Sequence, residues 1–163
     1  MARPRKQLNF RAAAEALTEP GAERATMAAI ARRLDVAKPT LYRMAGSREE
    51  LVQICVDAEA ERLLEQLHRA DGLRGFVAFA QDSPAGFALL FGGRYPEARA
   101  AVRRVENRVC EDLRRDGVPQ AQLLAAGLLG LAVGVARRAL EDGAPPDSLD
   151  LQVLLERILP AGT

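Results

Sequence analysis

Histidine, cysteine and tryptophan are rare or missing in this sequence. His68 is the only histidine, Cys55 and Cys110 are the only cysteines, and there is no tryptophan. The sequence therefore has too few residues for a metal centre built from several His and Cys ligands. It also lacks the second imidazole that some catalytic triads would need. We expect no catalytic residues, no metal site and no cofactor, and we interpret the protein as a non-enzyme.

Export signals and long hydrophobic runs are also lacking. The chain does not open on a hydrophobic segment, and two cysteines cannot form a disulfide framework. The longest stretch without a polar side chain, residues 123–136, has 14 residues, whereas ~20 are needed to cross a bilayer. We expect a cytoplasmic protein that makes no membrane contact and that buries this stretch as a core helix.

The charge that is present is divided unevenly along the chain. The first 48 residues contain ten Lys and Arg against four Asp and Glu, a net charge of +6. The remaining residues contain 13 Arg against 18 Asp and Glu, a net charge of −5. A basic head on an acidic body indicates that the head meets a polyanion, although an Arg-rich solvated surface would have the same composition.

Apolar residues repeat with a period of ~3.6 in nearly every segment and alternate in none, so we predict an all-α protein of about nine helices. Ser47 and Glu50 form a capping box that opens a long helix with two apolar faces. We place the domain boundary there, between a small N-terminal domain at 1–46 and a helical C-terminal domain at 47–163. The predicted helices span 7–19, 26–34, 37–44, 47–70, 72–81, 84–91, 96–116 and 123–136, with a last one capped by Asp147.

Two helices carry patterns from which we predict packing. In the first helix, Phe10 shares a face with Ala13, Ala14 and Leu17, and we expect that face to be buried. In the stretch 123–136, the glycines lie close to one face, where they would let another helix backbone approach closely. These glycines are Gly127, Gly130 and Gly134.

Two short helices joined by a tight turn at Asp35, the second of them basic, have the plan of a helix-turn-helix. The second helix of such a motif enters a DNA major groove ~12 Å wide. Leu41 is expected to face inward with Ile30 and Val36. The predicted contacts to double-stranded DNA from this helix are Lys38, Pro39, Thr40, Tyr42 and Arg43.

The segments 26–31, 34–43 and 46–51 resemble the N-terminal DNA-binding unit of TetR-family transcriptional regulators, over about residues 8 to 56 without a gap. The resemblance implies an all-helical homodimer with three-helix DNA-binding heads and a larger body that binds a small molecule. It also implies that Thr26, at the start of the second helix, touches phosphate. Lys38, Thr40, Tyr42 and Arg43 match recognition-helix positions of the family, and Arg48 matches a basic residue at the start of its fourth helix.

Departures from the family pattern keep a second hypothesis open. Met44 and Ala45 stand where the family has His-Phe, and Ala37 stands where a capping Ser is common. A lost N-cap destabilises a helix start by ~1 kcal/mol. The alternative is therefore a dimeric protein-interaction module whose DNA-binding head is vestigial.

The body supports two interpretations of its aromatic residues. Phe76, Phe79, Phe87 and Phe91 either pack the core or line a pocket for a small apolar effector. Arg94 and Tyr95 either orient such a ligand or belong to a surface loop.

The apolar helices near 120–142 and 147–159 either form a homodimer interface or build the monomer core. A two-fold dimer would present two recognition helices ~34 Å apart to a palindromic operator. Our main hypothesis is a ligand-responsive DNA-binding regulator that acts as a repressor.

Overall fold

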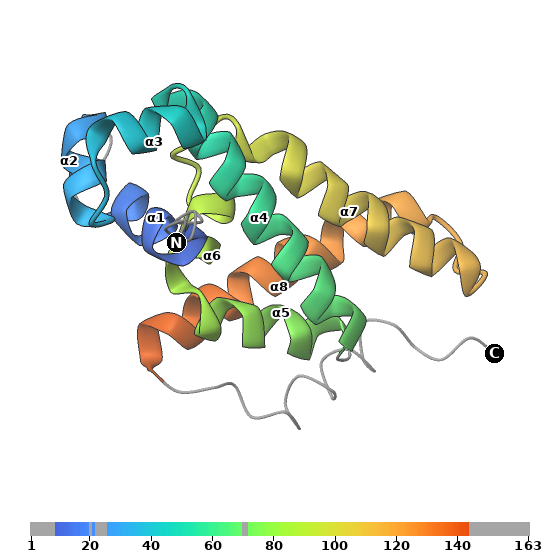
Figure 1. Cartoon of the computed structure of the whole chain (residues 1–163). Helices are drawn as coiled ribbons and strands as arrows, with labels where there is room; N and C mark the ends of the chain where they lie inside the picture. Colours follow the sequence, from blue (N-terminus) through green and yellow to red (C-terminus); the bar gives the residue numbers. More distant parts are fainter. Residues whose placement is uncertain (1–8, 20, 22–25, 70–71, 144–163) are drawn as a thin grey trace. The chain divides into compact units, whose positions relative to one another are not determined.

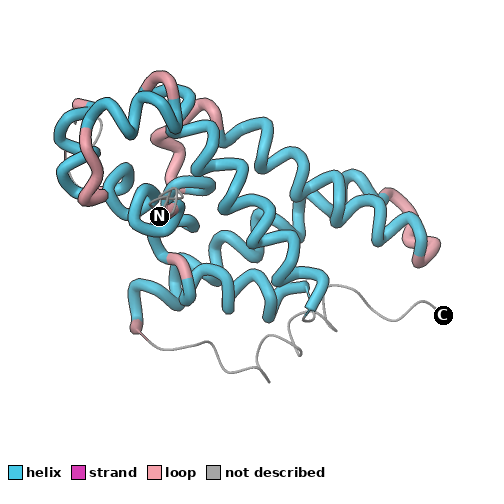
Figure 2. The backbone as a smooth tube through the Cα atoms, viewed as in Figure 1, coloured by secondary structure: helices cyan, strands magenta, loops and turns pink. Residues whose placement is uncertain are grey.

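The computed structural model describes residues 9–19, 21, 26–69 and 72–143, which form helices joined by loops and turns (Figure 1, Figure 2). No strand occurs in this part of the chain, and the all-α prediction is confirmed. The predicted ninth helix, after Asp147, lies outside the described residues. The eight helices are α1 (Phe10–Thr18), α2 (Met27–Arg33), α3 (Lys38–Ala45), α4 (Arg48–Arg69), α5 (Gly72–Asp82), α6 (Pro84–Phe91), α7 (Ala98–Arg115) and α8 (Ala121–Asp142).

The first helix differs from its prediction at its N-terminus. Asn9 has an extended backbone, and its side-chain Oδ1 accepts a hydrogen bond from the backbone N–H of Ala12 at 3.2 Å. This N-cap starts α1 at Phe10, so the predicted start at residue 7 is wrong. Phe10, the first residue of α1, is 40% exposed, whereas Ala13, Ala14 and Leu17 of the predicted face are buried.

The start of α4 is confirmed. The Oγ of Ser47 accepts a hydrogen bond from the backbone N–H of Glu50 at 3.1 Å, which is the N-cap half of the predicted capping box. Gly46, just before it, has a φ of +63°, a conformation that glycine adopts without strain. The end of α3 and the beginning of α4 are thus joined by a short, conformationally specified turn.

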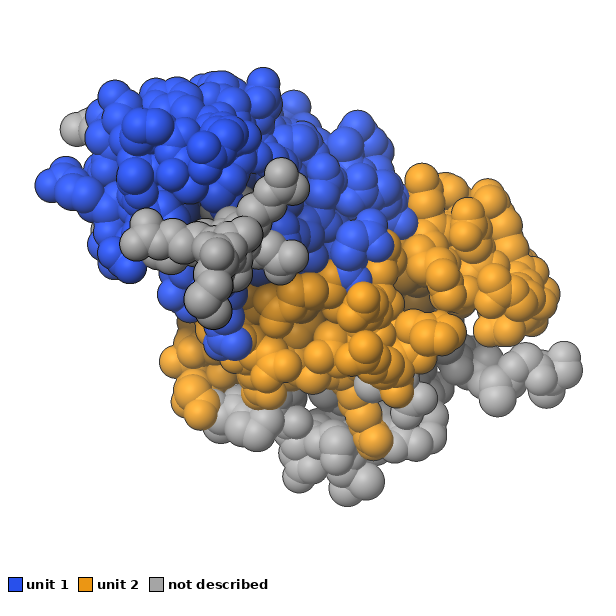
Figure 3. Space-filling model, viewed as in Figure 1, with its two compact units in different colours: residues 1–61, 85–104 blue, residues 62–84, 105–163 orange. Residues whose placement is uncertain are grey.

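The chain forms two compact units (Figure 3). Unit 1 comprises residues 1–61 and 85–104, and unit 2 comprises residues 62–84 and 105–163. The helices α4 and α7 contribute residues to both. The predicted functional boundary between 1–46 and 47–163 does not coincide with this division and stays a prediction.

Unit 2 is organised by the packing of α5 against α8. Gly75 of α5 also lies so close to the end of α4 that a Cβ there would meet the backbone oxygen of Gln66 at 2.6 Å. Only a residue without a side chain permits this approach. The start of α5 is thereby held against the last turns of α4.

The apolar segment 123–136 belongs to a longer helix than predicted, since α8 has 22 residues. By length and composition alone α8 could cross a membrane, but the core helix of a soluble protein passes the same test. Its buried residues form one stripe along the helix and are mostly small. They are Ala121, Ala125, Leu129, Ala132, Ala136 and Ala139.

The prediction that the whole segment is buried is therefore wrong, because one stripe covers only part of the helix circumference. Leu123 is 69% exposed. The close approach of another helix at the three glycines is also not seen among the described residues. A Cβ placed on Gly127, Gly130 or Gly134 would have no described atom within 4 Å. These residues belong to a face of α8 that the described residues leave uncovered.

Candidate nucleic-acid interface

Two helices and the turn between them form the predicted helix-turn-helix in unit 1. Thr26 caps α2, because its Oγ1 accepts a hydrogen bond from the backbone N–H of Ala29 at 3.2 Å. After α2 the backbone N–H of Val36 donates to the carbonyl of Ala31 at 3.0 Å. Asp35 in this turn has a φ of +51°, a left-handed conformation that Asp tolerates better than most residues. The turn therefore folds as the sequence predicts.

The helix α3 divides into a buried and an exposed face. Leu41 and Ala45 are almost fully buried and hold α3 against the head. Thr40 and Met44 lie at the border between the two faces. The exposed face carries two positive charges and a phenol hydroxyl, the groups that donate to phosphates and base edges. Its residues are Lys38, Pro39, Tyr42 and Arg43.

Lys38 and Tyr42 are one helical turn apart and contact each other. The Lys38 ammonium lies 5.7 Å from the centre of the Tyr42 ring, within the range of a cation–π interaction. This contact restricts both side chains on the exposed surface before any partner binds. Tyr42 is still 44% exposed.

The beginning of α3 lacks the side-chain cap that the other two helices of the head possess. Ala37 occupies the N-cap position and makes no side-chain hydrogen bond. Pro39 compensates in part, because its fixed φ suits the first helical turn and its missing N–H has no helical partner to lose. The weaker helix start expected from Ala37 stays a prediction.

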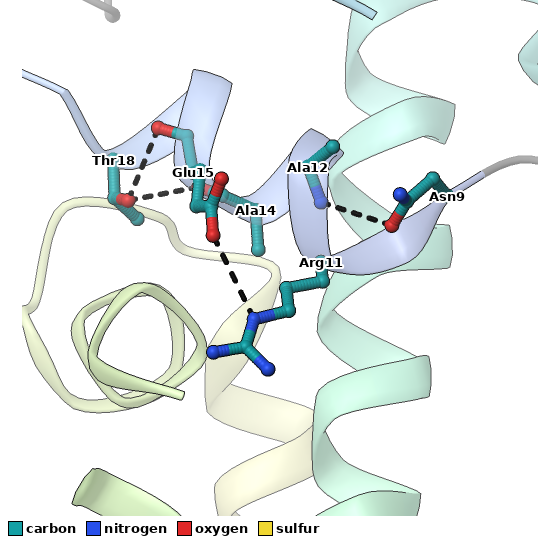
Figure 4. Close-up of polar contacts among 6 residues, drawn as sticks. All are labelled: Asn9, Arg11, Ala12, Ala14, Glu15 and Thr18. Carbon is teal, nitrogen blue, oxygen red and sulfur yellow. Dashed lines mark hydrogen bonds and ion pairs between the residues drawn. The ribbon is translucent and has the colours of Figure 1, made fainter. Parts of the chain in front are cut away.

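Other basic residues of the head are engaged in ion pairs. Figure 4 shows Arg11 reaching along α1 to Glu15, with Nε and Oε1 3.7 Å apart. In the same helix, Thr18 closes the last turn by donating its hydroxyl to the carbonyl of Ala14 at 2.8 Å (Figure 4). Arg33, in the last turn of α2, forms an ion pair with Glu19. Lys38 and Arg43 supply the positive charge on the exposed face of α3.

The structure changes the interpretation of two arginines near the recognition helix. Arg48 is half-buried, and its guanidinium lies 5.9 Å from the centre of the Tyr95 ring, so it contacts an internal aromatic residue. Arg32 is exposed in the last turn of α2, directly before the turn to α3. Arg32 was not among the predicted DNA contacts, although its position beside the predicted turn was a usable signal.

A separate apolar cavity lies within unit 2. Its volume is about 180 Å³. Residues from α4, α5, α7 and α8 line it, among them Leu73, Phe76, Val105, Val109, Leu128 and Leu129.

Of the four phenylalanines proposed for ligand binding, only Phe76 lines this cavity. Phe79 is buried in unit 2. Phe87 and Phe91 lie in unit 1 and pack on each other, with ring centroids 5.4 Å apart.

Comparison with known proteins identifies one part of the chain. Residues 10–54 match the family model described as bacterial regulatory proteins, tetR family. The match begins with α1 and ends inside α4, so it contains the whole helix-turn-helix. No curated protein is similar enough to the chain to be matched.

Proposed function

We propose that this chain, whose residues 10–54 match the tetR family model, is a DNA-binding regulator and acts as a cytoplasmic, ligand-responsive repressor. In this proposal a homodimer binds a palindromic operator and blocks transcription until an effector reaches the body. One observation carries the proposal. The helix α3 is anchored by buried Leu41 while it presents Lys38, Tyr42 and Arg43 outward.

Each exposed residue of α3 has a proposed task. Arg43 contacts guanine or phosphate, Tyr42 donates its hydroxyl to a phosphate, and Lys38 supplies a second positive charge. Thr40 lies at the edge of this surface and contacts phosphate or a thymine methyl group. Pro39 contributes by shaping the start of the helix, and Thr26 places the start of α2 at the DNA backbone. Arg48, at the start of α4 and half-buried against Tyr95, is proposed as a further contact to the DNA backbone.

Dimerisation is proposed through the face of α8 that the described residues leave uncovered. Leu123 is 69% exposed, and the helix presents three glycines with no described atom near them. A second copy of the same helix would cover both features, because small residues permit a close crossing of helices. We include residues 147–159 in this interface on the strength of the sequence pattern alone.

Effector binding is proposed for the cavity of unit 2. Its wall is formed by aliphatic side chains and Phe76, and its volume of about 180 Å³ is below the ~300 to 1,000 Å³ of typical ligand pockets, so the proposed effector is correspondingly small. Such a site selects an uncharged, apolar ligand, because a charged group would lose its hydration without gaining a partner. The helix α4 provides residues to both compact units and is the proposed carrier of the signal, through a tilt of ~1 to 2 Å.

The test of DNA binding is selection of bound sequences from a randomised double-stranded DNA pool. The parent protein is compared with a Tyr42→Ala, Arg43→Ala double variant at moderate salt. We expect the parent to enrich a palindrome and the variant to enrich no sequence. The apparent binding constant of the parent should also fall steeply with salt, because several Lys and Arg displace counterions.

The alternative function is a dimeric protein-interaction module with a vestigial head. It rests on Met44 and Ala45, which replace a phosphate donor and an aromatic core residue of the family pattern. The same experiment decides between the two functions. A parent protein that enriches no sequence, and whose DNA binding shows no salt dependence, would support the alternative.

A further inference from the structure

The connection between α6 and α7 supplies hydrogen-bond partners to the end of α1. A helix leaves its last carbonyl groups without intrahelical partners. The Tyr95 hydroxyl donates to the carbonyl of Leu17 at 2.5 Å. Nη1 of Arg94 donates to the carbonyls of Thr18 and Glu19 at 3.3 Å and 3.1 Å. Two adjacent residues thus satisfy three consecutive carbonyls that lie more than 70 positions earlier in the chain.

Tyr95 also contacts the other end of the head. Its ring lies under the guanidinium of Arg48, the first residue of α4, at 5.9 Å. The side chain is only 7% exposed, so both contacts are made away from solvent. The hydroxyl therefore holds the end of the first helix of the head, and the ring holds the point where the head continues into α4.

The backbone around Tyr95 is itself fixed to α7. The carbonyl of Tyr95 accepts from the N–H of Ala98 at 3.2 Å, and that of Pro96 accepts from Arg99 at 3.1 Å. These bonds form the first turn that leads into α7. A displacement of this end of α7 must therefore move Tyr95, and the directional bonds of Tyr95 pass the displacement to α1 and α4.

We propose that Arg94 and Tyr95 set the orientation of the DNA-binding head, with Tyr95 as the positioning residue. The inference rests on the proposed function, since orientation matters only if two heads must fit one operator. Neither residue belongs to the exposed surface of α3. Loss of the Tyr95 hydroxyl should therefore alter the fit to two half-sites and leave recognition of a single half-site intact.

The chain offers a matched control, because its only other tyrosine is Tyr42 on the exposed face of α3. Tyr95→Phe and Tyr42→Phe delete the same hydroxyl at two different places. Binding of each full-length variant is measured to the selected operator and to an isolated half-site. We expect Tyr95→Phe to weaken operator binding by about fivefold, the equivalent of one lost hydrogen bond, with half-site binding unchanged. Tyr42→Phe should weaken both.

A merely structural role for Tyr95 predicts a different pattern. If the hydroxyl only stabilised the fold, Tyr95→Phe would lower operator and half-site binding together, or would lower the melting temperature and neither affinity. Either result overturns the proposal.

A charge-matched pair of variants tests Arg94 in the same way. Arg94→Ala should weaken operator binding about twofold, since the hydrogen bonds of Arg94 are exposed. Arg103→Ala, on the exposed surface of α7, should leave it unchanged.

A second measurement does not depend on DNA and separates failure of this inference from failure of the proposed function. Spin labels at Arg32→Cys in α2 and Arg103→Cys in α7 report the distance between the head and α7 within one chain; both positions are exposed and lie in unit 1. We expect the distance distribution to shift or broaden with Tyr95→Phe and to stay as in the parent with Tyr42→Phe. Identical distributions in all three proteins would overturn the inference, whether or not the parent binds DNA.

Discussion

Each compact unit has an apolar core, but the polar contacts inside unit 1 join residues farther apart in sequence than those inside unit 2. In unit 1, polar contacts join residues far apart in sequence. Tyr95 donates to Leu17, and Nη2 of Arg104 lies 2.9 Å from a carboxylate oxygen of Asp57. In unit 2, α5 and α8 pack through apolar and small side chains around a cavity of about 180 Å³.

Because of this difference, unit 1 has a fixed geometry and unit 2 has an interior that can adapt. Hydrogen bonds and ion pairs depend on direction, so they specify one arrangement of α1, α4 and the start of α7. Apolar packing is not directional, and a cavity leaves part of it unfilled. Unit 1 is therefore suited to present a recognition helix, and unit 2 is suited to admit a ligand.

The largest expected effect comes from adding the same volume to both units. Ala14 is fully buried in α1, and Ala132 lines the cavity of unit 2. Ala14→Leu should lower the free energy of unfolding by about 1 to 3 kcal/mol, because a filled core must distort to admit it. Ala132→Leu should raise it by up to about 1 kcal/mol, because the new side chain fills empty space.

Denaturant unfolding measures both changes, and helix propensity does not confuse them because Ala and Leu are both strong helix formers. Equal destabilisation by the two variants would contradict the contrast between the units. If the cavity is the effector site, Ala132→Leu should also abolish the response of operator binding to any effector found by screening.

The next effect concerns the uncovered face of α8. Leu123→Glu should weaken a homodimer by about 2 kcal/mol, the scale of a central interface residue. It should leave the stability of the single chain nearly unchanged, since the side chain is 69% exposed there. Sedimentation equilibrium gives the dissociation constant. Phe10→Glu, at an exposed apolar residue of unit 1, is the control and should leave the dimer intact.

The last prediction tests how well unit 1 excludes water. Burial, together with the neighbouring Glu59 carboxylate, raises the pKa of the Cys55 thiol from 9.0 to about 12. Between these values the unfolded chain has lost the proton while the folded protein keeps it. Stability should therefore fall as pH rises above about 9, by about 1.4 kcal/mol per pH unit in the limit.

The measurement is the free energy of unfolding from pH 8 to pH 10.5 for the parent and for Cys55→Ala. The difference between the two proteins isolates this thiol from the other groups that titrate in the range. Parallel pH profiles would show that Cys55 is reached by water in the folded protein.

Local signals explain why the helix-turn-helix could be predicted from the sequence. The Thr26 cap, the turn at Asp35 and the inward face of Leu41 each depend on residues a few positions apart. Those relations are visible in a single sequence, and the structure reproduces them.

Contacts between distant residues explain what could not be predicted. Tyr95 was expected to orient a ligand or lie in a surface loop, yet it is buried and bonded to a residue 78 positions away. No periodicity encodes such a pair. The burial of α8 was also overestimated, because hydropathy shows that a helix is apolar but not how much of its surface its own chain covers.

Because tryptophan is absent and tyrosine is scarce, the intrinsic fluorescence of the protein can be assigned to individual residues. With no tryptophan and only two tyrosines, its intrinsic near-ultraviolet emission comes from Tyr42 and Tyr95 alone. One ring lies on the exposed face of α3, and the other lies between α1 and α4. Removing either hydroxyl-bearing ring by substitution to Phe leaves a single emitter, so unlabelled protein can report separately on the DNA surface and on the contact behind it.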